Sequence, residues 1–198
     1  MSESIRPANS PLQLSIFVAV AAGLCWSGVI VLLYVGNLQA ETLLAPQRLI
    51  FYTLVLAACL LTFVPIERAT AIGGLTLYGT ASLALLCYTL AFVPAPHEWL
   101  LSLPDTPVYA LLLLAIFGSV TTIATPFIYA LGRRIFRQRA RQGDLGRTRR
   151  QAAEIGFFAA ATAALASLRV LTWVSLLLLA LIILIAELLF LSRVEVEG

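Results

Sequence analysis

The sequence predicts an all-α protein, a polytopic transmembrane helix bundle with six transmembrane helices in a single membrane domain over residues 1–198. Of the 198 residues, 61% are hydrophobic and 12% are charged, whereas soluble domains carry about 45–50% apolar and about 25% charged residues. A water-soluble fold of this length could not bury so much apolar surface. The apolar residues form stretches of about the length that crosses a bilayer, and the arginines gather between two of these stretches.

Four apolar stretches come first. The stretch over residues 12–35 has an apolar run too long for the core of a cleaved signal peptide. The next spans 46–65 and begins at Pro46, a residue type that suits the first turn of a helix. The third spans 71–93 and the fourth 108–131. Each is close to the roughly 20 residues that one helical crossing needs.

The last apolar block, residues 151–191, is about twice as long as one crossing requires. Its central charge is Arg169, so we predict two helices, over 149–168 and 172–191, joined by a tight turn. Thr172 is a residue type that caps helix N-termini. The alternative is one very long helix, which would leave the membrane while still covered with leucine and isoleucine.

The placement of arginine predicts the orientation, because cytoplasmic loops carry an excess of basic residues. All 13 basic residues are arginine, and the predicted cytoplasmic loop 132–150 is rich in them. If this loop is cytoplasmic and the chain crosses the membrane six times, Arg6, Arg68 and Arg193 are cytoplasmic too. The arginines of the loop itself are Arg133, Arg134, Arg137, Arg139, Arg141, Arg147, Arg149 and Arg150. Outside lie Arg48 and Arg169. Both termini are then cytoplasmic, in a multi-pass protein of the cell membrane, such as a bacterial inner membrane.

The composition also restricts the chemistry. The sequence has no lysine, so a Schiff-base mechanism is excluded. Cys25, Cys59 and Cys87 lie in separate apolar stretches without the CxxC spacing of zinc and redox sites. Hydrolase, metalloprotease, dinucleotide-binding and P-loop motifs are absent. We therefore expect no enzyme activity, no cofactor and no metal.

The fourth predicted helix carries the most polar segment. Ser119, Thr122, Thr125 and Pro126 lie within three turns, beside Gly118. Pro126 should free a backbone carbonyl, and the threonine hydroxyls are available to satisfy freed groups. The segment is therefore a candidate polar path for a solute. The alternative is a kinked and packed helix whose hydroxyls are bonded internally.

Glu187 is the acidic residue that lies clearly inside an apolar run. A carboxylate in a membrane segment is a candidate functional group, here a proton or cation site. The alternative is a structural ion pair, for which Arg193 or the Arg133/Arg134 cluster lies within reach.

Four arginines of the loop are candidate docking residues: Arg133, Arg134, Arg137 and Arg141. Three of them recur every four residues and share a helix face. Anionic lipid headgroups are the first expected partner, at about 1 kcal/mol per arginine near the surface. An acidic protein partner is the alternative. A nucleic acid is not expected, because the patch lacks interleaved aromatic residues for base stacking.

Rows of small residues predict close helix packing. Such rows are Gly156, Ala160 and Ala164 in the fifth predicted helix, and Ala19, Gly23 and Ser27 in the first. They indicate either tight packing within the chain or contact with other membrane subunits or a second copy. We therefore expect a non-catalytic integral membrane protein, a membrane-embedded accessory or scaffold subunit in contact with the lipid bilayer.

Two groups of phrases lie within residues 23–50 and 116–133. They are Gly23-Leu24-Cys25-Trp26 with Pro46-Gln47-Arg48-Leu49-Ile50, and Ile116-Phe117-Gly118-Ser119 with Tyr129-Ala130-Leu131-Gly132-Arg133. These phrases resemble the drug/metabolite transporter superfamily, and they cover about a quarter of the chain. The resemblance implies the alternative function, a small-solute transporter of drug/metabolite-exporter type. That family has ten helices in two repeats, or four in its small dimeric members, whereas this chain is predicted to have six. Residues 149–193 look similar to small bacterial membrane proteins.

Overall fold

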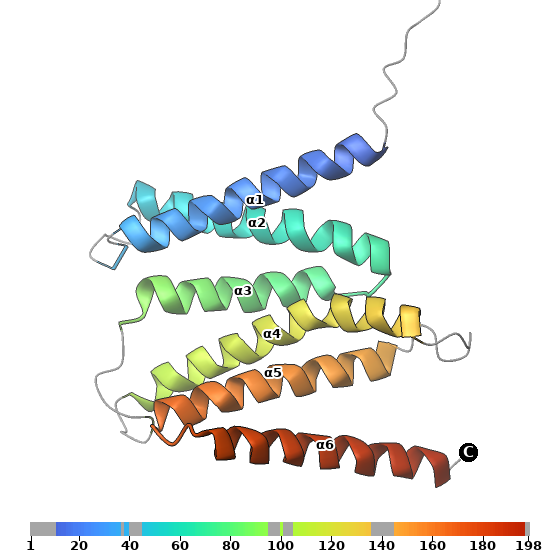
Figure 1. The fold of residues 1–198 in the computed structure, drawn as a ribbon. Coiled ribbons are helices and arrows are strands. Elements are labelled where there is room, and N and C mark those ends of the chain that lie inside the picture. The colour runs from blue at the N-terminus through green and yellow to red at the C-terminus, as the bar shows by residue number, and fades with distance from the viewer. Residues whose placement is uncertain are drawn as a thin grey trace, which may run out of the picture. The chain divides into compact units, whose positions relative to one another are not determined.

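The computed structural model describes residues 11–36, 38–39, 45–94, 100, 105–135 and 145–196. Within these ranges the chain forms six α-helices and no strand (Figure 1), which confirms the predicted all-α class. Four helices are long and apolar enough to cross a membrane, over Ser15–Val35, Pro46–Thr70, Leu75–Phe92 and Thr106–Arg134. The six crossings and the positions of the termini stay predictions. The chain divides into two compact units, residues 1–80 and 81–198, which are described in turn.

The N-terminal unit is built on the pairing of α1 (Pro11–Val35) with α2 (Pro46–Thr70). Its core consists of almost fully buried side chains: Ala22, Val29, Phe51, Val55, Ala58, Cys59 and Phe63. One polar bond crosses this apolar contact, since Trp26 Nε1 donates to Thr62 Oγ1 at 3.1 Å. Thr62 Oγ1 donates in turn to the Ala58 carbonyl at 2.7 Å. The indole N–H of Trp26 is therefore satisfied inside an apolar helix pair, as buried indoles usually are.

Arg48 holds the connection before α2. It lies in the first turn of the helix, yet it is only 8% exposed. Its Nε donates to the Leu38 carbonyl at 2.9 Å, and its Nη2 donates to the Gln39 carbonyl at 3.3 Å. A buried guanidinium requires such acceptors. In this structure Arg48 therefore anchors the backbone between α1 and α2.

The turn from α2 to α3 (Leu75–Phe92) corrects two predicted helix boundaries. The helix predicted over 46–65 continues through Pro65 to Thr70. Ala71 ends it in the left-handed region, with φ of 55°, and donates its N–H to the Glu67 carbonyl. Gly74 follows with φ of 85°, a conformation that glycine adopts without strain. The helix predicted to begin at residue 71 therefore begins at Leu75.

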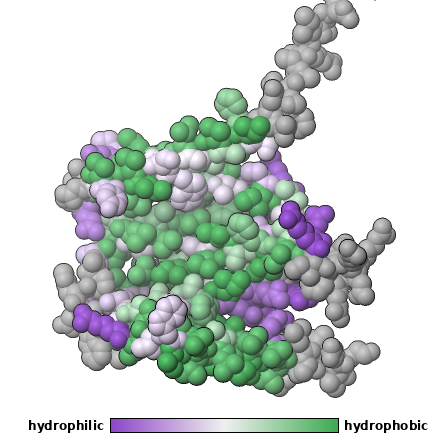
Figure 2. Space-filling view, in the orientation of Figure 1, coloured by the Kyte–Doolittle hydropathy of each residue, from purple (hydrophilic) through white to green (hydrophobic). Residues whose placement is uncertain are grey.

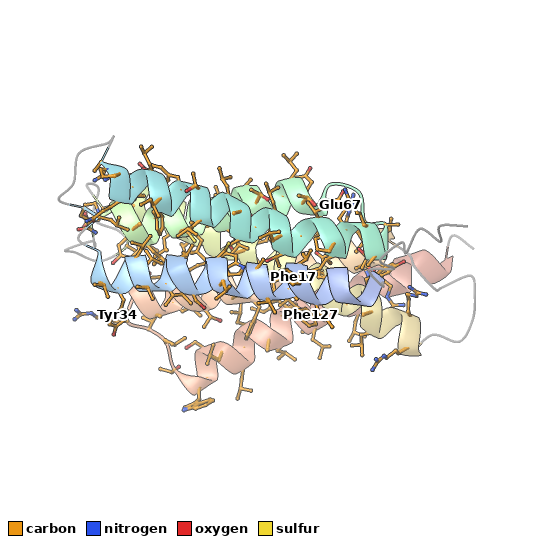
Figure 3. The ribbon with its side chains drawn as sticks, turned by 90° about the horizontal axis from the view of Figure 1, so that it is seen from above. Phe17, Tyr34, Glu67 and Phe127 are labelled. Carbon is orange, nitrogen blue, oxygen red and sulfur yellow. The ribbon has the colours of Figure 1, made fainter. Side chains whose placement is uncertain are left out.

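Glu67 connects the two helices at this turn, where Figure 3 labels it. Its Oε1 accepts the N–H of Gly74 at 3.0 Å, and its Oε2 accepts the N–H of Thr76 at 2.6 Å. Backbone N–H groups at a helix N-terminus have no partner within the helix, and negative charge is favoured there. A side chain of α2 therefore caps α3.

The C-terminal unit is built on the extensive contact of α4 (Thr106–Ile135) with α5 (Leu145–Ser167). The two helices approach closely at the buried Gly156. A Cβ added there would lie 2.7 Å from the Phe117 carbonyl oxygen and 3.2 Å from Thr121 Cβ. The predicted packing role of Gly156 is thus confirmed within the chain. Gly23 of α1 differs, because a Cβ added there meets no atom within 4 Å.

The turn between α5 and α6 (Trp173–Val196) is formed as predicted, so the single long helix is wrong. Arg169 adopts φ of 57°, and the N–H of Val170 bonds the Leu165 carbonyl at 3.1 Å. This is the Schellman pattern that ends helices. Thr172 caps α6, because its Oγ1 accepts the N–H of Ser175 at 3.2 Å. The Ser175 hydroxyl oxygen accepts the N–H of Thr172 in return, at 2.8 Å.

The predicted loop 132–150 is shorter than expected. α4 continues to Ile135 and α5 begins at Leu145, so both ends of the predicted loop are helical. Arginine is a good helix former, and the basic residues in the last turn of α4 oppose the negative end of the helix dipole. The apolar residues of α4 and α5 stop before these helices end. A change to polar residues marks the end of the apolar surface, and the helix can continue beyond it.

Large apolar side chains are exposed on α1 and α6, whose green surfaces are visible in Figure 2. On α1, Phe17 is 78% exposed and Tyr34 is 92% exposed; both are labelled in Figure 3. On α6 the exposed apolar residues are Trp173, Val174, Leu177, Leu178, Leu181, Ile182, Leu184, Ile185, Leu188 and Leu189. At 3.6 residues per turn these positions fall on one half of the circumference of α6, and the other half carries Glu187. So wide an exposed apolar face needs an apolar medium or further protein against it.

Candidate functional site

The hydroxyl groups of α4 form the first part of the predicted site. Ser119, Thr122 and Thr125 are 2%, 5% and 6% exposed. Ser119 Oγ donates to the Ser82 carbonyl of α3 at 3.1 Å. Thr122 and Thr125 each donate to the carbonyl four residues earlier, those of Gly118 and Thr121, both at 2.7 Å. All three hydroxyls are thus bonded to backbone carbonyls of packed helices.

Pro126 lies inside α4, which continues to Ile135. Because proline has no N–H, the Thr122 carbonyl loses its usual partner within the helix. One turn earlier, Thr121 Oγ1 is buried and has no hydrogen-bond partner among the described residues. This oxygen lies against Gly156, where the two helices approach closely. Within the polar segment of α4, Thr121 therefore lies at the contact with α5, whereas Ser119 bonds α3.

Glu187 is the second part, and the structure gives it a partner that the sequence analysis did not name. Arg150 Nη2 of α5 lies 2.9 Å from Glu187 Oε1. Gln151 Nε2 lies 3.5 Å from the same oxygen. Arg150 also pairs with Glu154, whose Oε1 is 3.7 Å from Arg150 Nε. The structure thus brings together an arginine and two carboxylates, between α5 and α6.

A sequence signal for this cluster exists. Arg150 and Glu187 lie at nearly equal distances in sequence from the turn at Arg169. Two antiparallel helices joined by that turn therefore bring the two residues level. Arg150 and Glu154 also have the four-residue spacing of a helical ion pair. The predicted partner Arg193 lies where the structure does not describe side chains, and Arg133 and Arg134 are exposed.

The basic residues form the third part. Arg133 and Arg134 occupy the last turn of α4 and are exposed. The guanidinium carbon of Arg133 lies 6.0 Å from the ring centroid of Tyr129, the distance of a cation–π contact. Arg137 and Arg141 lie outside the described residues. The first turns of α5 add Arg147 and Arg149, so arginines occur on both sides of residues 136–144.

Metal-ligating side chains are not clustered in the described part of the chain, where no group of three His, Cys, Asp or Glu residues lies close enough to hold a metal ion. Cys25, Cys59 and Cys87 are free thiols. Cys59 and Cys87 are buried, and Cys25 is partly exposed.

These features define a class: an all-helical protein with at least four helices able to cross a membrane and with an ion cluster between its last two helices. The comparisons with known proteins do not narrow this class. No protein-family model, no curated protein and no solved structure matches the chain.

Proposed function

We propose that this chain is a non-catalytic integral membrane protein that serves as a membrane-embedded accessory or scaffold subunit. In this proposal all six helices cross a cell membrane, and both termini and the arginine-rich segment lie in the cytoplasm. The observation that carries the proposal is the wide apolar face that α6 exposes, together with the exposed apolar residues of α1. Surfaces of this kind are covered by lipid or by the helices of other subunits.

The bonding of the α4 hydroxyls supports a packed helix over a solute path. A path needs polar groups that face the solute, whereas Ser119, Thr122 and Thr125 are buried and donate to carbonyls.

The small residues of α1 support contact between subunits. Ala19, Gly23 and Ser27 are exposed, and the position of Gly23 has no neighbouring atom within 4 Å.

Purification from native membranes in a mild detergent tests this proposal. We expect the chain to elute with another membrane protein or with a second copy, in fixed proportion. Gly23→Leu should reduce that association without unfolding the chain, because space is free around Gly23. Gly132→Leu is the matched control, since its position on α4 is equally open. A wild-type chain that elutes alone as a single monomeric species contradicts the proposal.

Anionic lipid headgroups are the proposed partner of Arg133, Arg134 and the neighbouring arginines. The two described side chains are exposed at the end of α4, where charge attraction to lipid contributes about 1 kcal/mol per arginine. Replacing both by glutamine should lower the amount of anionic lipid that remains bound after purification. Arg169→Gln, which removes an exposed arginine elsewhere, should leave it unchanged. Equal retention in all three proteins contradicts this assignment.

A small-solute transporter of drug/metabolite-exporter type is the alternative. The observation that favours it is the buried Thr121 oxygen, which has no described partner and precedes Pro126 in the same helix. Uptake of cationic and apolar dyes into proteoliposomes tests this alternative. Transport that is lost in Thr121→Val but kept in Thr162→Val would support it. The control threonine lies on α5 and donates to the Phe158 carbonyl. No transport above empty liposomes would exclude it for these solutes.

A further inference from the structure

The attachment of α6 to the rest of the C-terminal unit depends on few contacts. α6 touches α5 at a small number of positions, and its large apolar side chains are mostly exposed. At one end the turn over residues 168–172 joins the helices. Towards the other end lies the cluster of Arg150, Glu154 and Glu187. This cluster is therefore well placed to decide whether α6 lies against α5.

The charges of this cluster do not balance. Two carboxylates face one guanidinium, and the guanidinium is closer to Glu187, at 2.9 Å, than to Glu154, at 3.7 Å. Glu187 is the less exposed of the two, with 16% of its side chain exposed against 29% for Glu154. Two like charges that lie close together repel each other, and this repulsion favours a proton on one of the two carboxyl groups.

The hydrogen bonds point to the position of that proton. Glu187 Oε2 is buried and has no hydrogen-bond donor among the described residues. The Glu154 and Glu187 carboxyl groups are neighbours, because both lie against the same guanidinium, that of Arg150. Two ionised carboxylates only accept hydrogen bonds, so they cannot bond each other. A proton on Glu154 would let its carboxyl group donate a hydrogen bond to Glu187, which has an oxygen without a donor.

We propose that Glu154 and Glu187 share one proton at the contact of α5 with α6, and that this proton holds α6 in place. Glu187 stays ionised beside Arg150, and Glu154 donates to Glu187. When the pH rises, Glu154 loses the proton, the two carboxylates repel each other, and α6 separates from α5. The contact is thus a pH-sensitive latch between the last two helices.

Further charged residues lie on the helices around this cluster. α5 carries Arg147 and Arg149 one turn or less from Arg150, and α4, which packs on α5, carries Arg133 and Arg134 in its last turn. These two α4 arginines are exposed, whereas the Glu187 carboxylate is largely buried. On α6, Arg193 and Glu195 lie in the part whose side chains the structure does not describe. Arg150 is the cation that the structure brings into contact with the two carboxylates.

Infrared spectroscopy of the full chain in lipid nanodiscs tests whether the proton is there. We expect the carbonyl band of a protonated carboxyl group at neutral pH, and its loss as the pH rises. Glu154→Gln should abolish this band. Glu67→Gln is the matched control and should keep it, because Glu67 accepts bonds from backbone N–H groups elsewhere in the chain. Absence of the band in the wild-type protein at neutral pH overturns the proposal.

A distance measurement tests the latch. Spin labels at Ile155 of α5 and Leu184 of α6, both exposed, report the separation of the helices once the three native cysteines are replaced. We expect one narrow distance at low pH that broadens as the pH rises. In Glu154→Gln the amide supplies a permanent donor, so the narrow distance should persist at high pH. A wild-type distance that does not change with pH, or the same change in Glu154→Gln, overturns the proposal.

Discussion

Hydroxyl side chains throughout the described helices donate to carbonyls of the preceding turn. The residues that do so are Thr53, Thr62, Thr70, Thr89, Thr122, Thr125 and Thr162. In apolar surroundings an unbonded hydroxyl is costly, and the carbonyl four residues earlier is the nearest acceptor. These threonine hydroxyls are therefore satisfied without water or a ligand, whereas those of Thr80 and Thr121 are buried and have no partner among the described residues.

The bond between the Trp26 indole and the Thr62 hydroxyl joins two helices, α1 and α2. We expect a double-mutant cycle of Trp26→Phe and Thr62→Val to give a coupling free energy of about 0.6 kcal/mol, and at most about 1.7 kcal/mol. The coupling stays modest because the separated helices find other partners in the membrane. Unfolding of the four proteins in mixed micelles measures it. A coupling energy of zero would show that the bond does not contribute to the α1–α2 contact.

Gly156 marks the closest approach of α4 and α5. Gly156→Ala should lower the free energy of unfolding by about 1–3 kcal/mol, the usual cost of overpacking, because the new Cβ would overlap the Phe117 carbonyl and the Thr121 side chain. The fall in the thermal unfolding midpoint in detergent reports this cost. Gly132→Ala, in open space on α4, should be neutral or stabilising. Equal midpoints for the two variants would contradict the close contact.

Helix ends are set by bonds that single residues make at the turns. α3 begins at Leu75 because Glu67 caps it from the preceding helix, and α6 begins at Trp173 because Thr172 and Ser175 cap each other. The cap at Thr172 is local in sequence, so the sequence predicted it. The cap by Glu67 depends on the left-handed turn at Ala71, which brings α2 back towards the start of α3. Sequence rules for helix caps consider only residues near the start of the same helix, so they do not detect a cap from the preceding helix.

The cap of α3 can be tested by removing the charge of Glu67. Glu67→Gln keeps the size of the side chain, but an amide presents only one acceptor oxygen to the two N–H groups of Gly74 and Thr76. We expect faster amide hydrogen exchange over residues 73–78, measured by mass spectrometry, with exchange in α5 unchanged. Glu154→Gln, in the other unit, should leave this segment as it is. Unchanged exchange in Glu67→Gln would show that the carboxylate is not needed there.

Pairing of helices was only partly accessible from the sequence. The small-residue pattern identified Gly156 as a packing residue, and the structure places it against α4. The same pattern in α1 is exposed at Gly23. The rows in α1 and α5 have the same spacing and similarly small residues. The sequence pattern therefore could not indicate which of the two rows packs within the chain. Likewise an ion pair was one of two interpretations of Glu187, with Arg193 or the Arg133/Arg134 cluster as partner. The structure pairs it with Arg150, because the turn at Arg169 aligns α5 with α6.

The number of crossings is a property of the whole molecule. The predicted six crossings and a four-helix alternative, in which α5 and α6 stay on one side, both leave the C-terminus in the cytoplasm. They differ at the turn between α5 and α6. A single cysteine at Val170, which is exposed, should react with a membrane-impermeant maleimide added outside intact cells if there are six crossings. Reaction only after permeabilisation would indicate four.

Two further cysteines control this experiment. Thr106→Cys should react from outside and Arg134→Cys only after permeabilisation, whichever number of crossings holds. Reversal of both results would mean that the chain is inserted in the opposite orientation, against the arginine distribution. The three native cysteines are replaced in each protein, and two of them, Cys59 and Cys87, are buried.

The sequence by itself determined the helical class, the positions of the apolar segments and the turn at residues 168–172. These depend on composition, on the length of apolar runs and on local capping, all of which act along the chain. The tertiary structure alone decided which polar groups meet. Trp26 bonds Thr62, Glu67 caps α3, and Arg150 lies between Glu154 and Glu187. Such contacts depend on how helices rotate and align, and in an apolar chain a few polar groups set that alignment because each must find a partner.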